Sequence, residues 1–197
     1  MENLQKGIRM LFISSVITAT CALVTVFSIE AINNIAGIAA IVALVLELIG
    51  IIRLSKENLQ FKRVIILLIL SIALTAIGAI LGITFGIIFA LQDDAQALLA
   101  TSAIVIAVVS LIAALFNVLI NLFIIIGLKE ITNDEGTKSL AKIVLFCTVF
   151  TLALSGVLGF IATIVTLGWL AIIGTIIGLI GDICFVVLLA KMDKEFS

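Results

Sequence analysis

The stretch VIILLILSIALTAIGAILGITFGIIFA, residues 64–90, decides the fold class, because it runs for 27 positions without a charged side chain. About 20 apolar residues in a helix cross the hydrocarbon core of a bilayer. The rest of the chain is similar: 64% of its 197 residues are hydrophobic, 12% are charged, and the mean hydropathy is +1.48. A soluble domain is about 45–50% apolar and about 25% charged. The sequence therefore predicts an all-α, polytopic membrane protein.

The basic residues divide the chain into hairpins. All eleven Lys and Arg residues lie in four short segments, and the stretches between them, 10–52, 64–128 and 143–190, contain none. Each stretch is long enough for two helical spans and a turn, and two spans return the chain to the side on which it started. Positively charged loops stay in the cytoplasm. We therefore expect six spans, both termini in the cytoplasm, and a bacterial or archaeal plasma membrane.

Polar and small residues that interrupt the apolar runs predict three outer turns: Glu30, Asn33 and Asn34; then Gln92, Asp93, Asp94 and Gln96; then Thr166, Leu167, Gly168 and Trp169. The expected spans are residues 10–29, 34–52, 64–90, 98–128, 143–165 and 169–190. The first is expected to remain as a span and not to be removed as a signal peptide. The middle hairpin is longer than two crossings need, so its helices are expected to tilt or to project beyond the membrane.

A short repeat relates the hairpins to one another. Glu2-Asn3-Leu4-Gln5 recurs as Glu57-Asn58-Leu59-Gln60, and each copy is followed by a basic residue and then by a span. Such placement indicates internal repetition. We expect three related hairpins, packed into a single domain that covers residues 1–197.

Small residues recur at helical spacing in the spans. In lipid, helices approach closely where small side chains face one another. Two overlapping GxxxG patterns and a pair in the last span are the predicted packing positions: Gly78, Gly82, Gly86, Gly174 and Gly178. We expect these contacts within the bundle, with a homo-oligomer as the alternative.

Four polar residues form a predicted layer inside the membrane: Glu47, Asn117, Asn121 and Asp182. Counted back from the next basic residue at about 1.5 Å per residue, Glu47 lies about 9 Å and Asp182 about 13 Å inside the cytoplasmic edge. No basic residue lies at that depth, so each carboxyl group is expected to be protonated, hydrated from the cytoplasm, or bound to a cation. The functional interpretation is a cation or proton site. The alternative is that these side chains hold neighbouring helices together by hydrogen bonds.

The residue inventory argues against catalysis and against nucleic acid. There is no His, Tyr or Pro, and nothing resembles a catalytic, metal-binding or cofactor-binding constellation. Cys21, Cys147 and Cys184 lie in separate apolar runs without a CxxC pair, and we interpret them as small buried residues. No basic run could neutralise several phosphates. We expect no enzyme, no cofactor, no metal and no nucleic-acid partner.

Two classes of function remain. The first is a small transporter or permease subunit that carries a solute, cation or proton past the acidic layer. The second is a non-catalytic scaffold that binds lipid or another membrane protein, and the absence of proline favours it, because transporters commonly use helices interrupted by Pro or Gly. The unpaired acids favour transport, because ionisable residues inside the membrane are functional by default.

Overall fold

The computed structural model describes residues 2–26, 30–90, 95–165 and 167–196, and this part of the chain is all-helical. All six described helices are long and apolar enough to cross a membrane, which confirms the expected number of spans. Their bounds are α1 Glu2–Val26, α2 Glu30–Leu54, α3 Leu59–Ala90, α4 Ala95–Ile131, α5 Glu135–Val165 and α6 Gly168–Glu195.

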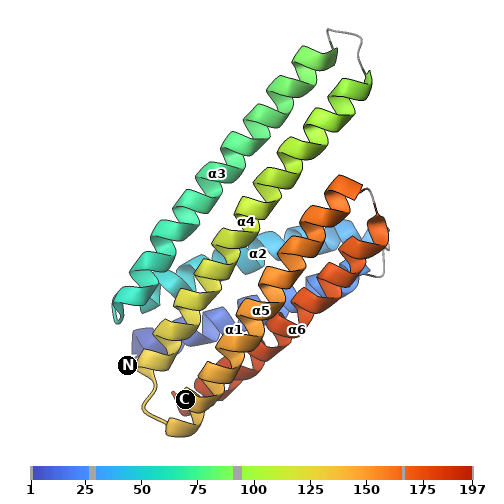
Figure 1. The fold of residues 1–197 in the computed structure, drawn as a ribbon. Coiled ribbons are helices and arrows are strands. Elements are labelled where there is room, and N and C mark those ends of the chain that lie inside the picture. Colours follow the sequence, from blue (N-terminus) through green and yellow to red (C-terminus); the bar gives the residue numbers. More distant parts are fainter. Residues whose placement is uncertain (1, 27–29, 91–94, 166, 197) are drawn as a thin grey trace.

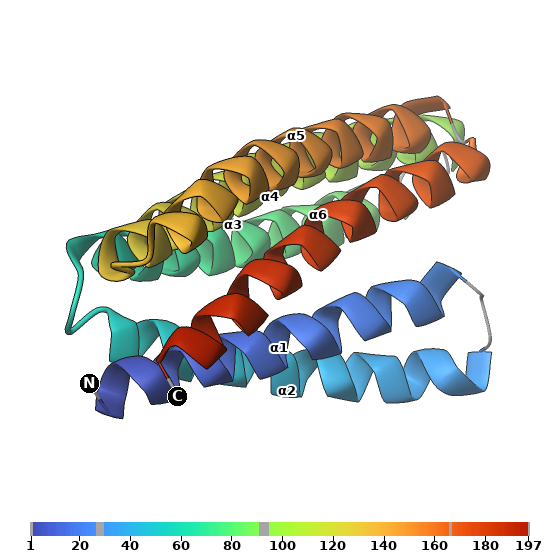
Figure 2. The same cartoon turned by 90° about the horizontal axis from the view of Figure 1, so that it is seen from below.

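Consecutive helices run antiparallel, and α1 packs on α2, α3 on α4, and α5 on α6 (Figure 1). Further contacts join α4 to α5 and α1 to α6, whereas α2 and α3 make the smallest contact of the pairs that touch. Figure 2 shows the α1–α2 pair on one side of α6 and the α3, α4 and α5 helices on the other. The helix α6 therefore connects two parts of the bundle.

Both termini lie at the same end of the bundle, together with the connections 55–58 and 132–134 (Figure 1). We call this end the basic end, because every Lys and Arg residue belongs to a segment that reaches it. Two points remain predictions. One is the side of the membrane that the basic end faces, and the other is that the three hairpins are related by internal repetition.

The tightest packing in the bundle is at the basic end. An apolar cluster there takes side chains from all six helices, and Ile8, Leu54, Phe61, Leu128 and Met192 in it are fully buried. Two glycines let α1 and α2 approach closely: a Cβ added at Gly50 would stand 3.0 Å from the carbonyl oxygen of Gly7. Close approach of backbones at small residues is how helices gain packing in lipid.

We expect Gly50→Leu to lower the free energy of unfolding by about 1–3 kcal/mol, because overpacking forces neighbouring atoms to shift. The matched control is Gly82→Leu, since nothing lies within 4 Å of a Cβ built at that glycine. Both variants add the same apolar side chain to a membrane helix. Unfolding in mixed micelles would show the difference, and equal losses in the two variants would contradict the close α1–α2 contact.

Polar side chains link the connections at the basic end. Thr132 donates its hydroxyl to the Glu195 carboxylate at 2.6 Å, and Asn58 and Gln60 donate to Glu130 at 2.8 and 3.0 Å. Asp134 precedes α5 and accepts from the backbone N–H of Thr137 at 2.7 Å, which is the N-cap arrangement. These bonds fix how the helix pairs meet at this end.

Asp134 gives stability a defined pH dependence. Hydrogen bonds from the side chain and then the backbone of Thr137, followed by one from Lys191, lower the pKa of Asp134 from 3.8 to about 2. Its contribution is therefore complete above about pH 4 and is lost as the pH falls toward 2. We expect Asp134→Ala to lower the thermal midpoint by a few degrees at pH 7. Asp134→Asn should keep most of the cap but lose the pH-dependent part; equal pH profiles for wild type and Asp134→Asn would contradict this.

The middle hairpin has the extra length that the sequence predicts. Its helices have 32 and 37 residues, which correspond to about 48 and 56 Å at about 1.5 Å per residue, against a hydrocarbon core of about 30 Å. Figure 1 shows both extending past the far ends of the other helices.

The predicted outer turns need correction. Glu30, Asn33 and Asn34 belong to α2, which begins at Glu30, and Gln96 belongs to α4. Polar residues occur in the first turn of helices as well as in turns, so their positions in the sequence do not by themselves locate a turn. At the third turn, Leu167 precedes α6, and Gly168 and Trp169 begin it. Gln92, Asp93, Asp94 and Thr166 lie outside the described residues.

The cysteines are less separate and less buried than the sequence suggests. The sulfur atoms of Cys147 and Cys184 lie 3.3 Å apart, where α5 packs on α6. Cys21 lies near the carbonyl oxygen of Ala36, at 3.5 Å. All three are free thiols and only partly buried. The sequence predicted buried cysteines, whereas all three are only partly buried, and the α5–α6 register brings two of them together.

Candidate functional site

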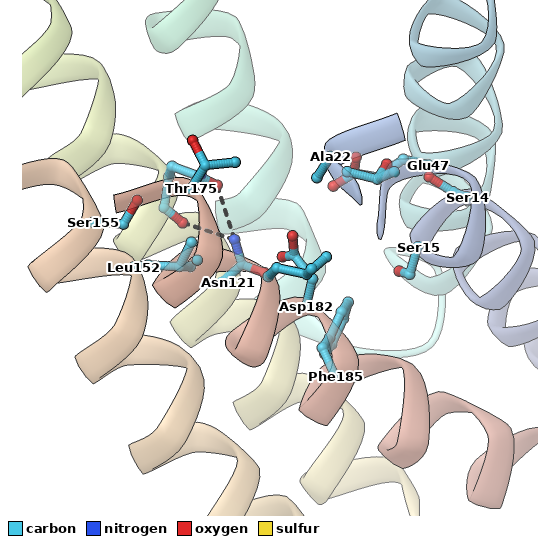
Figure 3. A pocket seen from close by; sticks show the side chains of 14 residues that line it. Ser14, Ser15, Ala22, Glu47, Asn121, Leu152, Ser155, Thr175, Asp182 and Phe185 are labelled. Carbon is cyan, nitrogen blue, oxygen red and sulfur yellow. Dashed lines mark hydrogen bonds between the residues drawn. The ribbon is translucent and has the colours of Figure 1, made fainter. Parts of the chain in front are cut away.

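The acidic layer borders an open pocket among the helices, with a volume of about 330 Å³, at the lower end of the range for small-molecule sites. Five helices line it, and no described residue of α3 contributes. Its walls hold all four residues of the predicted layer (Figure 3). The lining residues are Ser14, Ser15, Thr18, Ala22, Glu47, Asn117, Asn121, Leu152, Ser155, Thr175, Gly178, Leu179, Asp182 and Phe185. We call this space the acidic cavity.

Helical spacing explains why these residues share one cavity. On α6, Thr175, Gly178 and Asp182 are three and four positions apart and therefore lie on one face. On α1, Thr18 and Ala22 are four positions apart and do the same. These two helices thus turn rows of small or polar side chains toward the cavity, which occupies the room that these small side chains leave.

Figure 3 shows the carboxyl groups of Glu47 and Asp182 directed into the same space, from α2 and from α6. Among the residues that the structure describes, neither carboxyl group has a hydrogen-bond or ion-pair partner. The cavity therefore holds two acids and no compensating positive charge.

Three polar groups of the cavity present acceptor atoms, whereas the amide of Asn117 and the hydroxyls of Ser15, Thr18 and Ser155 keep donors with no acceptor among the described residues. Asn121 donates its amide to the carbonyl and side-chain oxygens of Asn117 at 3.0 and 2.9 Å, so its own side-chain oxygen stays available. The hydroxyl of Ser14 donates to the Ala43 carbonyl at 2.8 Å, and that of Thr175 donates to Ala171 at 3.0 Å. Because these protons are already used, the oxygen lone pairs remain for a ligand. These acceptor oxygens, beside two carboxyl groups, suit a cation.

The apolar cluster closes the cavity toward the basic end. Phe185 lines the cavity and also belongs to that cluster, where it is 8% exposed. Beyond it lie fully buried Leu188 and Leu189, one turn nearer the end of α6. Hydration of the acids from the basic end, one of the three states that the sequence left open, would therefore require water to pass this packed layer.

The glycines that the sequence predicts as packing positions differ in how closely a neighbouring helix approaches them. A Cβ at Gly78 would stand 2.7 Å from a methyl carbon of Val109, so α3 and α4 are in close contact there. Gly174 and Gly178 face Ser155 of α5, with Cβ positions 3.3 Å from its carbonyl and hydroxyl oxygens respectively. These three glycines lie at helix contacts within the bundle.

Gly82 differs from the prediction, because nothing lies within 4 Å of a Cβ built there. It is one turn from Gly78 on the same helix, yet it faces away from close neighbours, so a GxxxG pattern alone does not identify a contact. The surroundings of Gly86 lie outside the described residues.

Sequence reasoning missed the role of the hydroxyl residues on the other cavity walls. Ser14, Thr18 and Ser155 follow helical spacing and suggest packing stripes, and Ser15 carries no signal of its own. The presence of Ser and Thr at these positions, where Ala or Gly would pack equally well, could have indicated a polar cavity. Hydroxyl groups in a membrane helix need acceptors or water.

The cavity does not resemble a metal centre built from many charged ligands. Within the described ranges, no group of three or more Cys, Asp or Glu side chains is placed to hold a metal ion. Comparisons with protein-family models, with curated proteins and with solved structures found no match for this chain. What the fold and the cavity define is a class: an integral membrane protein with six apolar helices and an acidic cavity among them.

Proposed function

We propose that this protein is a small transporter or permease subunit whose acidic cavity binds a cation or a proton between Glu47 and Asp182. The observation that carries the proposal is the pair of carboxyl groups in one cavity without a positive partner among the described residues. An ionised carboxylate in hydrocarbon costs about 3 kcal/mol or more on insertion scales. Binding of a proton or a cation removes that cost.

The ligand set fits this role. Carboxylate and amide oxygens are the ligands that hard cations prefer, and Asn117 and Asn121 add neutral oxygens beside the two acids. The carboxyl groups come from α2 and α6, so a cation bound by both would link the two parts of the bundle that α6 joins. Occupancy of the site could thereby bias the arrangement of these helices.

In this proposal the basic end faces the cytoplasm, as the distribution of Lys and Arg favours. The three hairpins are related by internal repetition, and the apolar cluster serves as the closed cytoplasmic gate. The cavity then receives its ligand from the opposite side or from the bilayer. Transport would require the cluster to open at some stage of the cycle.

The test is flux in proteoliposomes that contain a pH indicator. A sodium or tetramethylammonium gradient is imposed, and the internal pH and the uptake of the cation are followed. We expect flux that falls at least tenfold in Glu47→Gln and in Asp182→Asn, and that is unchanged in Glu57→Gln, an exposed acid outside the cavity. Absence of flux for every cation, or equal flux in all variants, would contradict transport.

One observation favours the alternative, a scaffold that binds lipid, a membrane protein or a second copy. The α3–α4 pair extends past the other helices, and exposed apolar side chains cover α3, for example Ile69 at 61% and Ile83 at 64%. Together with the open face at Gly82, this arm offers a surface for another membrane helix. Stable co-purification of a partner through α3, without flux, would favour this class.

A further inference from the structure

A second hollow lies beside the acidic cavity, on the apolar surface between α1 and α6. It has a volume of about 250 Å³, and its walls are Val16, Ala19, Thr20, Leu23, Leu179, Ile183, Val186 and Val187. Its single polar side chain, Thr20, donates its hydroxyl to the carbonyl oxygen of Val16 at 2.8 Å. With that donor used within its own helix, the described lining offers an occupant apolar contact and, at Thr20, a single acceptor oxygen.

The groove and the acidic cavity share a wall. Leu179 lines both, and the two faces of α1 alternate between them: Thr18 and Ala22 line the cavity, whereas Ala19 and Leu23 line the groove. Leu179 therefore separates the two hollows where α1 meets α6. A molecule that passes this one side chain would meet two acids on one side and a hydrocarbon surface on the other.

We propose that the ligand is an organic cation with an apolar chain, whose charged head lies beside Glu47 and Asp182 and whose chain lies in the groove. This inference rests on the proposed function and names its substrate class. Charge complementarity selects the head, since the cavity offers two carboxyl groups and acceptor oxygens. The groove selects the chain, since it has no unsatisfied polar group.

The dimensions favour such a ligand over a bare inorganic ion. The cavity of about 330 Å³ is in the range of small-molecule sites, and Leu152, Leu179 and Phe185 give it apolar walls beside the polar ones. A head group with methyl or methylene substituents would contact both kinds of wall. A single small ion would leave most of the space to water.

The position of the groove also provides a route. A chain in the bilayer is already in hydrocarbon, so its passage into the groove does not expose it to water. Only the charged head changes surroundings, from the membrane interface to the acidic cavity. Entry between α1 and α6 therefore bypasses the packed apolar cluster at the basic end.

Photolabelling in lipid nanodiscs tests the inference. The probe is decyltrimethylammonium with a diazirine on its chain, and the control probe is decyl sulfate with the same labelled chain. We expect the cationic probe to label groove residues, and excess decyltrimethylammonium to reduce that labelling at least tenfold. The Glu47→Gln/Asp182→Asn variant should lose labelling to the same extent, and decyl sulfate should not label the groove above the lipid background.

A groove-filling variant separates the chain from the head. Ala19→Trp fills the groove, and Ile13→Trp places the same side chain on an exposed part of α1 outside it. We expect Ala19→Trp to lower labelling at least tenfold and Ile13→Trp to leave it within twofold. Val187→Trp fills the groove from α6 and replaces Ala19→Trp in this test if that variant does not fold.

The outcomes distinguish this inference from the proposed function. In one outcome, tetramethylammonium protects Glu47 and Asp182 from a carbodiimide reagent, but neither groove variant lowers photolabelling. The groove then does not bind the apolar chain, and the proposed cation site is retained. Equal labelling by decyl sulfate would reduce the groove to an ordinary lipid contact and would also overturn the inference. If neither sodium nor tetramethylammonium protects the acids, the proposed function fails as well.

Discussion

Replacing Glu47 by Gln and Asp182 by Asn together should raise the free energy of unfolding at pH 8, by about 2 kcal/mol, because each carboxylate in an apolar setting is costly without a partner. The amides keep the shape of the side chains but carry no charge. Unfolding of the purified variant in mixed micelles, with no cation other than the buffer base, measures the change. A gain in stability together with a loss of flux is typical of a functional site.

Glu130 is the control for this prediction, because its carboxylate does join neighbouring segments. Glu130 accepts hydrogen bonds from Asn58 and Gln60, so Glu130→Gln should lower stability. If the cavity variant loses stability in the same way, Glu47 and Asp182 join helices in the bundle, and the transport proposal should be abandoned in favour of the structural alternative.

Single cysteines in the cavity should react from only one side. In a chain whose native cysteines are replaced by Ala, we expect Thr175→Cys to react with a membrane-impermeant thiol reagent at least ten times faster from the side opposite the basic end. The physical reason is the apolar cluster, which begins at Phe185 and separates the cavity from that end.

Two positions provide the controls for this labelling. Glu57→Cys, in the connection 55–58, reports the side of the basic end, and Leu188→Cys, at a fully buried position in the cluster, should react from neither side. Equal rates at position 175 from both sides would mean that an open path crosses the cluster, and would contradict the closed gate.

The fold was largely predictable from charge. Six spans follow from where Lys and Arg are absent, because a span cannot easily contain them. The length of α3 and α4 also follows from the stretch 64–128, which contains no basic residue. The exact turns did not follow, since Glu30 and Gln96 are polar residues that a helix tolerates at its first turn.

The candidate site was predictable in depth but not in shape. Counting residues from the nearest basic side chain placed Glu47, Asn121 and Asp182 at one level, and the structure brings them to one cavity. Whether such a layer packs tightly or encloses space depends on which helices touch, and sequence spacing does not encode that. The same reason explains why Gly82 faces open space and why Cys147 meets Cys184.

Carbodiimide labelling, read residue by residue by mass spectrometry, tests most directly whether Glu47 and Asp182 form one cation site. The protein is held in nanodiscs and treated with dicyclohexylcarbodiimide, with and without sodium, tetramethylammonium or decyltrimethylammonium. We predict that both carboxyl groups react, and that one of these cations slows both reactions together by at least tenfold while the exposed Glu57 is unaffected. Rates at Glu47 and Asp182 that no cation changes, or that change independently of each other, would contradict a shared site.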